Sequence, residues 1–163
     1  MRILVTGGSG FIGGHLAENF VRDGHDVVVL DTLDPFYDVG IKHRNIETAT
    51  ATAADGDGRY EFVEGSVTDK DLVQKLVRGV EYIFHQAAQA GVQASVQNPK
   101  KTTDINVLGT LTLLEAARDA DIERFVNASS SSVYGIPEYL PYDEAHPTTP
   151  ASPYAASKLS AEH

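Results

Sequence analysis

Short runs of apolar residues alternate along the chain with segments whose apolar residues recur every three to four positions. The runs have no polar face, which is typical of strands buried on both sides of a parallel sheet. They predict five strands, at residues 2–6, 27–30, 60–63, 81–85 and 124–128. The helical spacing predicts helices at residues 11–22, at 69–77 and within 99–120, a partial helix around 41–48, and a last helix that begins near Ser152 or Pro153. This alternation indicates an α/β fold with a doubly wound parallel sheet.

Two segments carry no regular pattern. Residues 49–54 contain only alanine and threonine, and residues 55–58 alternate aspartate with glycine. We expect a mobile surface loop over residues 49–58. Five of the seven prolines fall between residues 137 and 153, so we expect a loop over 135–152.

Charge and composition exclude several classes of function. The net charge of −10 argues against a nucleic-acid-binding surface, which needs lysine and arginine to contact phosphates. The chain has no cysteine, and its six histidines show no ligand spacing, so we expect no metal site. No apolar stretch approaches the roughly 20 residues of a membrane span, and residues 1–7 do not resemble a signal peptide. We therefore expect a cytoplasmic protein that does not contact membranes.

A glycine motif follows the first predicted strand. Residues 8–13 read G-x-G-x-x-G after Thr6 and Gly7, and the second strand ends at Asp31. Glycines at these positions let the backbone approach a pyrophosphate at a helix N-terminus, and an acidic residue at this distance binds ribose hydroxyls. The pattern predicts a three-layer Rossmann-like domain that binds NAD rather than NADP, because a carboxylate repels a 2′-phosphate. A glycine turn without a ligand is the alternative, and the flanking strand and helix disfavour it.

Tyr154 and Lys158 lie four residues apart, on one face of the last predicted helix. A nearby ammonium stabilises the phenolate form of tyrosine, which can act as a base near neutral pH. Together with the glycine motif, this pair indicates hydride transfer between a nicotinamide and a carbon that bears a hydroxyl. Without the other motifs, a surface pair on a helix would be the simpler interpretation.

These residues resemble the extended short-chain dehydrogenase/reductase family, in particular its NAD-dependent nucleotide-sugar epimerases and dehydratases. The resemblance covers the whole chain. Its motifs are at residues 6–13, 85–89, 106–110, 129–135 and 154–158.

The resemblance implies the positions that hold the cofactor. Phe11 and Ile12 would cover the pyrophosphate, and Ser66 and Val67 would flank the adenine, although many relatives have Asp at position 66. The segment 86–89 would line the nicotinamide side. The implied cofactor-binding residues are Gly7, Gly10, Phe11, Ile12, Gly13, Asp31, Ser66, Val67, Gln86, Ala87, Ala88, Gln89, Asn106, Tyr154 and Lys158.

The resemblance also implies a catalytic set of Ser130, Tyr154 and Lys158, and substrate contacts from Gln89, Ser130 and Tyr154. Dehydratases of this family have a Thr-Asp-Glu triplet where this chain has three serines at residues 130–132. Residues 34–38 and 87–92 are similar to UDP-glucuronate and UDP-N-acetylhexosamine 4-epimerases. The sequence thus favours a UDP-sugar 4-epimerase of the UDP-glucose 4-epimerase type. A UDP-glucuronate decarboxylase, a related dehydratase or oxidoreductase, and a non-catalytic NAD-binding module stay open.

Members of this family run on for about as many residues again. We therefore expect residues 1–163 to be an incomplete NAD-binding domain without the substrate domain, which binds NAD without efficient turnover alone. The resemblance also implies a homodimer through a helix at residues 104–120 and the helix that begins near Tyr154.

Overall fold

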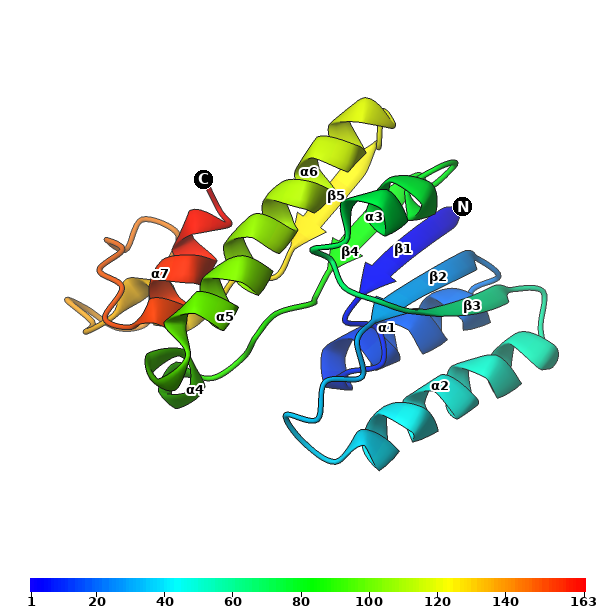
Figure 1. Cartoon of the computed structure of the whole chain (residues 1–163), viewed down its shortest axis with the longest axis horizontal. Coiled ribbons are helices and arrows are strands. Elements are labelled where there is room, and N and C mark those ends of the chain that lie inside the picture. The colour runs from blue at the N-terminus through cyan, green and yellow to red at the C-terminus, as the bar shows by residue number, and fades with distance from the viewer.

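The computed structural model describes residues 1–163 and contains one sheet of five parallel strands, in the order β3-β2-β1-β4-β5 (Figure 1). The strands are β1 (Arg2–Thr6), β2 (Asp26–Asp31), β3 (Arg59–Glu64), β4 (Tyr82–His85) and β5 (Arg124–Asn127). The α-helices are α1 (Phe11–Arg22), α2 (Val39–Ala54), α3 (Lys70–Leu76), α4 (Val92–Gln97), α5 (Pro99–Thr103), α6 (Gly109–Asp119) and α7 (Pro153–Ser160). The predicted doubly wound α/β fold is confirmed.

The centre of the sheet is β1, which pairs with β2 on one side and β4 on the other. The chain winds outward from β1 to β3, then crosses back to form β4 and β5. The strand order therefore reverses between β1 and β4. Ligands of open α/β sheets bind at the carboxyl ends of the strands at such a reversal.

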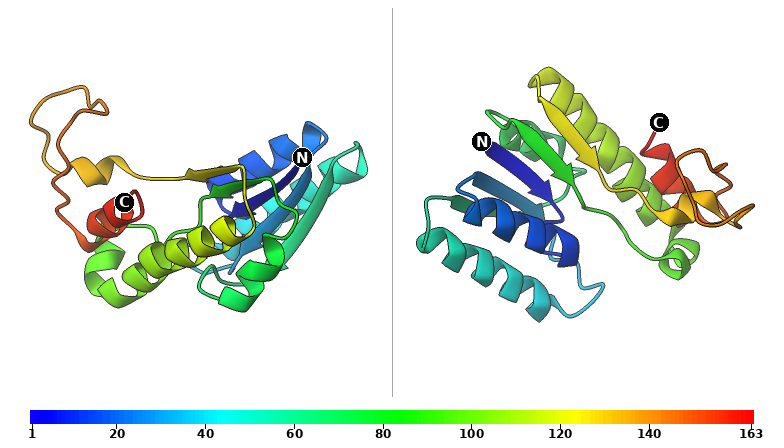
Figure 2. Two further views of the ribbon diagram at one scale, coloured as in Figure 1. Left: turned by 90° about the horizontal axis from the view of Figure 1, so that it is seen from above. Right: turned by 180° about the vertical axis from the view of Figure 1, so that it is seen from behind.

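Each face of the sheet has its own apolar core, and β1 contributes to both. Ile3 and Val5 pack on the face covered by α1, whereas Leu4 packs on the face covered by α3 and α6. Figure 2 shows α1 and α2 on one side of the sheet and α3 and α6 on the other. The strands are thus buried on both faces, as their uninterrupted apolar runs predict.

Side chains fix the start of several helices. The Asp69 carboxylate accepts a hydrogen bond from the Leu72 amide, and the Ser152 hydroxyl accepts one from the Ala155 amide. Pro153 occupies the first turn of α7, where a missing amide hydrogen costs nothing. These caps confirm the predicted starts of α3 and α7.

The predicted loop over residues 49–54 is wrong, because α2 continues through this segment to Ala54. Alanine has the highest helix propensity of all residues. Ala49 is buried, Ala53 packs against the core on the α1 face, and the Thr50 hydroxyl donates to the Ile46 carbonyl within the helix. Packing of one face therefore holds a segment whose composition suggested a loop.

The predicted helix within residues 99–120 is present but interrupted. A π-helical turn, η1 (Asp104–Leu108), joins α5 to α6. Ala117 is buried and Ile105 packs against the core, whereas Leu108, Leu111 and Leu114 remain between 42 and 51% exposed. The apolar positions of this segment thus divide between a core face and an open face.

Two short helices lie where none was predicted. These are α4 and a 3-10 turn, η2 (Ser131–Tyr134). Helix α7 packs against α4, α5 and η1, beyond the carboxyl end of the sheet (Figure 1). No helix is both long enough and apolar enough to cross a membrane.

Candidate active site

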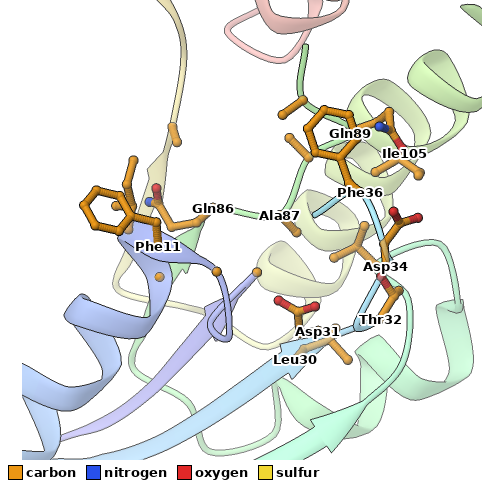
Figure 3. Close-up of a pocket in the computed structure, with 18 of the residues that line it drawn as sticks. Phe11, Leu30, Asp31, Thr32, Asp34, Phe36, Gln86, Ala87, Gln89 and Ile105 are labelled. Atoms are coloured by element: carbon orange, nitrogen blue, oxygen red, sulfur yellow. The ribbon is translucent and has the colours of Figure 1, made fainter. Parts of the chain in front are cut away.

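A pocket of about 370 Å³ lies at the carboxyl ends of the central strands. Its walls come from the β1–α1 turn, the segments after β2, β3, β4 and β5, and α7. Figure 3 shows Phe11 and Gln86 at one end of the pocket, with Phe36, Gln89 and Ile105 at the other. This volume is within the range of small-molecule and cofactor sites.

The glycine turn brings the backbone of β1 against the segment after β4. Gly7 has a φ of +67°, and a Cβ atom there would lie 2.7 Å from the Ala87 nitrogen. Helix α1 begins directly after this turn with no side-chain cap and no acidic residue in its first turn. Its N-terminal amides therefore remain available to an anion, as a pyrophosphate requires.

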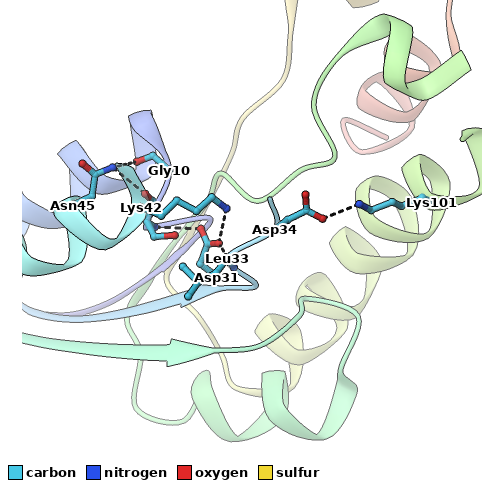
Figure 4. A network of polar contacts seen from close by, with 8 residues as sticks. Gly10, Asp31, Leu33, Asp34, Lys42, Asn45 and Lys101 are labelled. Atoms are coloured by element: carbon cyan, nitrogen blue, oxygen red, sulfur yellow. Dashed lines mark hydrogen bonds and ion pairs between the residues drawn. The ribbon is translucent and has the colours of Figure 1, made fainter. Parts of the chain in front are cut away.

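Asp31, at the end of β2, is part of a buried polar cluster (Figure 4). Its Oδ1 accepts hydrogen bonds from Lys42 Nζ at 3.0 Å and from the Leu33 amide at 2.8 Å. Its Oδ2 accepts one from the Ser9 amide at 3.3 Å. The carboxylate thus lines the pocket as a buried ion pair, with Lys42 from α2 as its partner.

Tyr154 and Lys158 line the opposite part of the pocket, from one face of α7. The Tyr154 amide donates to Ser95 Oγ at 3.0 Å, which fixes the first turn of α7 on α4. Lys158 is only 4% exposed and forms no ion pair. Burial lowers its pKa, and Glu162 opposes this effect. The ammonium is therefore held beside the pocket without a protein counter-ion.

The wall between these two regions is the segment 86–89, which Asn106 supports from behind. The Gln89 amide donates to Asn106 Oδ1 at 2.7 Å, and Asn106 Nδ2 donates to the Gln89 carbonyl at 3.2 Å. The same Nδ2 donates to Ser157 Oγ at 2.9 Å. One buried amide side chain in η1 therefore joins this wall to α7.

Comparison with known proteins shows where this arrangement belongs. The family model described as GDP-mannose 4,6 dehydratase matches residues 4–163. The chain belongs to this family.

The proteins to which this chain is similar include epimerases and dehydratases. A UDP-glucose 4-epimerase of Mycolicibacterium smegmatis is 42% identical over 164 residues, which cover 99% of this chain and 49% of that protein. The chain spans about half the length of the curated relatives it matches.

Two solved structures are similar in both sequence and fold. UDP-glucose 4-epimerase of Thermus thermophilus, solved in complex with NAD, is 38% identical with a TM-score of 0.83, and the match covers 100% of this chain and 49% of that one. The dTDP-glucose 4,6-dehydratase of Streptomyces venezuelae, solved with NAD and TYD, is also 38% identical, with a TM-score of 0.80 over 99% of this chain and 49% of that one. NAD is thus bound in epimerase and dehydratase neighbours alike.

The pocket brings together most of the residues that the sequence predicts to bind the cofactor, bind the substrate or act in catalysis. Ser130 and Asn106 are the assigned residues that do not line it. Asn106 lies behind the wall, as described above. Ser129 lines the pocket instead of Ser130, whose hydroxyl accepts a hydrogen bond from the Ser132 amide at the start of η2. The role of Ser130 stays a prediction.

Sequence reasoning missed the residues that close the pocket beyond Asp31. Lys42 is one, and the loop before α2 supplies Asp34 and Phe36. Asp34 pairs with Lys101 of α5 at 2.7 Å (Figure 4). Gly91 leaves room for the ring of Phe36, because a Cβ there would lie 3.3 Å from Phe36 Cζ. The sequence signal that could have revealed this loop is the Asp-x-Phe stretch at residues 34–36, shortly after the strand that ends at Asp31. Nowhere do three His, Cys, Asp or Glu side chains converge to hold a metal ion.

Proposed function

We propose that this chain is the NAD-binding part of a nucleotide-sugar 4-epimerase that acts on a UDP-sugar. The observation that supports this proposal most strongly is that Tyr154 and Lys158 line the same pocket as the glycine turn and Asp31. The Lys158 ammonium forms no ion pair there. The N-terminus of α1 suits the pyrophosphate, and Asp31 suits the adenosine ribose. NAD therefore fits the residues that are present.

When NAD is bound, its nicotinamide supplies a reversible acceptor for the hydride of sugar carbon 4. Tyr154, as phenolate, removes the proton of the sugar 4-hydroxyl and later returns it. Lys158 lines the same pocket from the same helix face, where its ammonium offsets negative charge that develops on the phenol oxygen. Ser130 caps the Ser132 amide and does not line the pocket in this structure, so its hydroxyl would have to turn toward the pocket to hydrogen-bond the sugar 4-hydroxyl and relay the proton. Gln89 contacts the sugar from the opposite wall.

The serine run supports epimerisation over elimination of water. An acid and a base are needed to remove water across sugar carbons 5 and 6. Residues 130–132 are serines, and no carboxylate replaces them in the lining of this part of the pocket. A retained sugar that is reduced again on its other face needs no acid or base from this chain beyond Tyr154, with Lys158 and Ser130 in support.

The open face of η1 and α6 supports a homodimer. Leu108, Leu111 and Leu114 are exposed on consecutive turns of η1 and α6, and η1 packs against α7. Covering these leucines with a second copy would remove apolar surface from water. The dimer would then bury the same helices that hold Asn106 and Tyr154.

The test uses the longest natural polypeptide that contains this sequence. It is incubated with NAD and, separately, UDP-glucose, UDP-glucuronate and UDP-N-acetylglucosamine, and the products are resolved by NMR. We expect the 4-epimer of one sugar and no net reduction of NAD. A 4-keto-6-deoxy sugar or release of carbon dioxide would contradict the epimerase assignment. Sedimentation of the same protein measures the proposed dimer.

A further inference from the structure

A buried histidine lies behind the pocket wall, away from the residues that line it. His85 ends β4 and is 2% exposed. Its Nδ1 is 2.7 Å from Thr6 Oγ1, at the end of β1, and its Nε2 is 2.9 Å from Thr110 Oγ1, in the first turn of α6. None of these three residues lines the pocket.

The partners of the two threonines determine the direction of every hydrogen bond. The Thr110 hydroxyl donates its one proton to the Asn106 carbonyl at 2.6 Å, because a carbonyl can only accept. Thr110 Oγ1 must therefore accept from His85 Nε2–H. A neutral imidazole carries one ring proton, so Nδ1 accepts from the Thr6 hydroxyl. Thr6 Oγ1 in turn accepts from the Ala87 amide at 3.2 Å.

Burial keeps the imidazole neutral. Desolvation, together with the nearby positive charge of Lys158, lowers the pKa of His85 to about 3. A neutral ring with the proton on Nε2 satisfies both nitrogens with the two hydroxyls. In the opposite tautomer the ring proton is on Nδ1. Neither Nε2 nor the Thr110 hydroxyl, whose own proton goes to Asn106, could then donate a hydrogen bond to the other.

Both ends of this chain of hydrogen bonds reach the pocket. One end is the Ala87 amide, in the wall formed by residues 86–89. At the other end, Thr110 holds the backbone carbonyl of Asn106, and the side chain of the same residue bonds Gln89 and donates to Ser157 Oγ. The Ser157 hydroxyl donates to the Tyr154 carbonyl at 2.7 Å. The network thus connects β1, β4 and η1 to the backbone of the proposed base.

We propose that His85, fixed between Thr6 and Thr110, is a positioning residue that holds the wall at residues 86–89 and Tyr154 in one relative placement. Its role rests on the proposed function, in which that wall faces the nicotinamide. His85 itself touches neither ligand. It acts through the Ala87 amide on one side and through Asn106 on the other.

The experiment compares Thr110→Val with Thr112→Val. Valine keeps the shape of threonine and removes the hydroxyl. Thr112 makes the same kind of hydrogen bond within α6, to the Leu108 carbonyl at 2.9 Å, but lies outside the network. Calorimetry measures the affinity of each variant for NAD and for ADP-ribose, which lacks the nicotinamide.

In Thr110→Val we expect the affinity for NAD to fall roughly threefold to tenfold, as for the loss of one hydrogen bond, while ADP-ribose binds as before. Thr112→Val should leave the ratio of the two affinities unchanged, and Thr110→Ser should restore it. An equal loss for both ligands, or no loss, overturns the positioning role and leaves the nucleotide site standing. A wild-type chain that binds neither ligand overturns the proposed function itself.

A second measurement needs no variant. In protein labelled with ¹⁵N-histidine, the His85 signals at neutral pH should show a protonated Nε2 and an unprotonated Nδ1. A proton on Nδ1 would reverse the hydrogen bond to Thr6 and overturn the proposal. The same spectrum of Thr110→Val reports whether that variant keeps its fold.

Discussion

Two lysines line opposite regions of the pocket, and their surroundings differ. Lys42 is 6% exposed and Lys158 is 4% exposed, so water reaches neither ammonium freely. Lys42 pairs with the Asp31 carboxylate, whereas Lys158 has no ion-pair partner. The charge of Lys42 is therefore balanced by a carboxylate 3.0 Å away, whereas Lys158 has no carboxylate within ion-pair distance and feels Glu162 only from farther off.

This difference between the two lysines separates the residues proposed to bind the cofactor from those proposed to act in catalysis. A buried ion pair has two desolvated charges that compensate one another, so removing one partner is costly. An unpaired buried charge lowers stability but stays available to a developing negative charge, such as a phenolate. Perturbed charges of this kind gather at functional sites. The comparison supports the proposed roles, in which Asp31 and Lys42 recognise the cofactor and Lys158 acts in catalysis with Tyr154.

The largest effect is expected from Tyr154→Phe in the longest natural polypeptide that contains this chain. Phenylalanine keeps the ring but removes the base that Lys158 supports, and general-base catalysis is typically worth about 10²–10⁴-fold. Turnover should fall by about this factor while NAD binding persists. Near-normal turnover in a product assay would show that the unbalanced charge of Lys158 serves another purpose.

A matched pair of substitutions tests the two lysines directly. Lys42→Met leaves the buried Asp31 carboxylate with only two backbone donors, and should cost about 3 kcal/mol of unfolding free energy. Lys158→Met removes a buried charge that has no partner, and should leave stability within about 1 kcal/mol or raise it. Urea unfolding of both variants measures the difference. Equal losses would contradict the contrast between the two regions.

The adenosine region can be tested through cofactor choice. Asp31→Ala should weaken NAD binding by roughly 1–3 kcal/mol, because the ribose hydroxyls lose their acceptor. It should weaken NADP binding less, since Lys42 is then free to attract the 2′-phosphate. Asp34→Ala is the control, because that carboxylate pairs with Lys101 and not with Lys42. Calorimetry that finds an unchanged preference in Asp31→Ala would remove Asp31 from this role.

The sequence predicted the parts of the molecule that depend on local pattern. The apolar runs marked the strands, and the Ser152-Pro153 pair marked the start of α7. Composition misled at residues 49–54, because only the packing of Ala49 and Ala53 reveals that α2 continues there. Local pattern is sufficient to predict a segment that is buried on both faces. It is insufficient where the packing of one weakly apolar face determines whether a helix continues.

The site divides in the same way. The glycine turn, Asp31 and the Tyr154–Lys158 pair lie in short motifs, so their spacing and the motifs around them were enough to predict that they share one site. Pairing of Lys42 with Asp31 depends on how α2 packs against α1 and β3, which no local pattern encodes. His85 was expected only to end a strand, and it does, but its two threonine partners come from β1 and α6.

An effect smaller than those of Tyr154→Phe and Lys42→Met concerns His85, behind the wall at residues 86–89. In the native state the pKa of His85 is about 3, whereas an unfolded histidine has a pKa near 6.5. Between these values the unfolded state binds the extra proton, so stability falls as the pH falls. From pH 7 to pH 5 the loss should be about 2 kcal/mol for this group. In His85→Asn this part of the pH dependence should vanish.

The exposed His43 serves as control for this last prediction, and His43→Asn should keep the wild-type slope of stability against pH. Urea unfolding at both pH values measures each slope. An unchanged slope in His85→Asn would mean that folding does not change the pKa of His85, so that burial does not keep this imidazole neutral. His85 would then carry a second positive charge near Lys158 at pH 5, and the contrast between the two lysine regions would no longer rest on Lys158 alone.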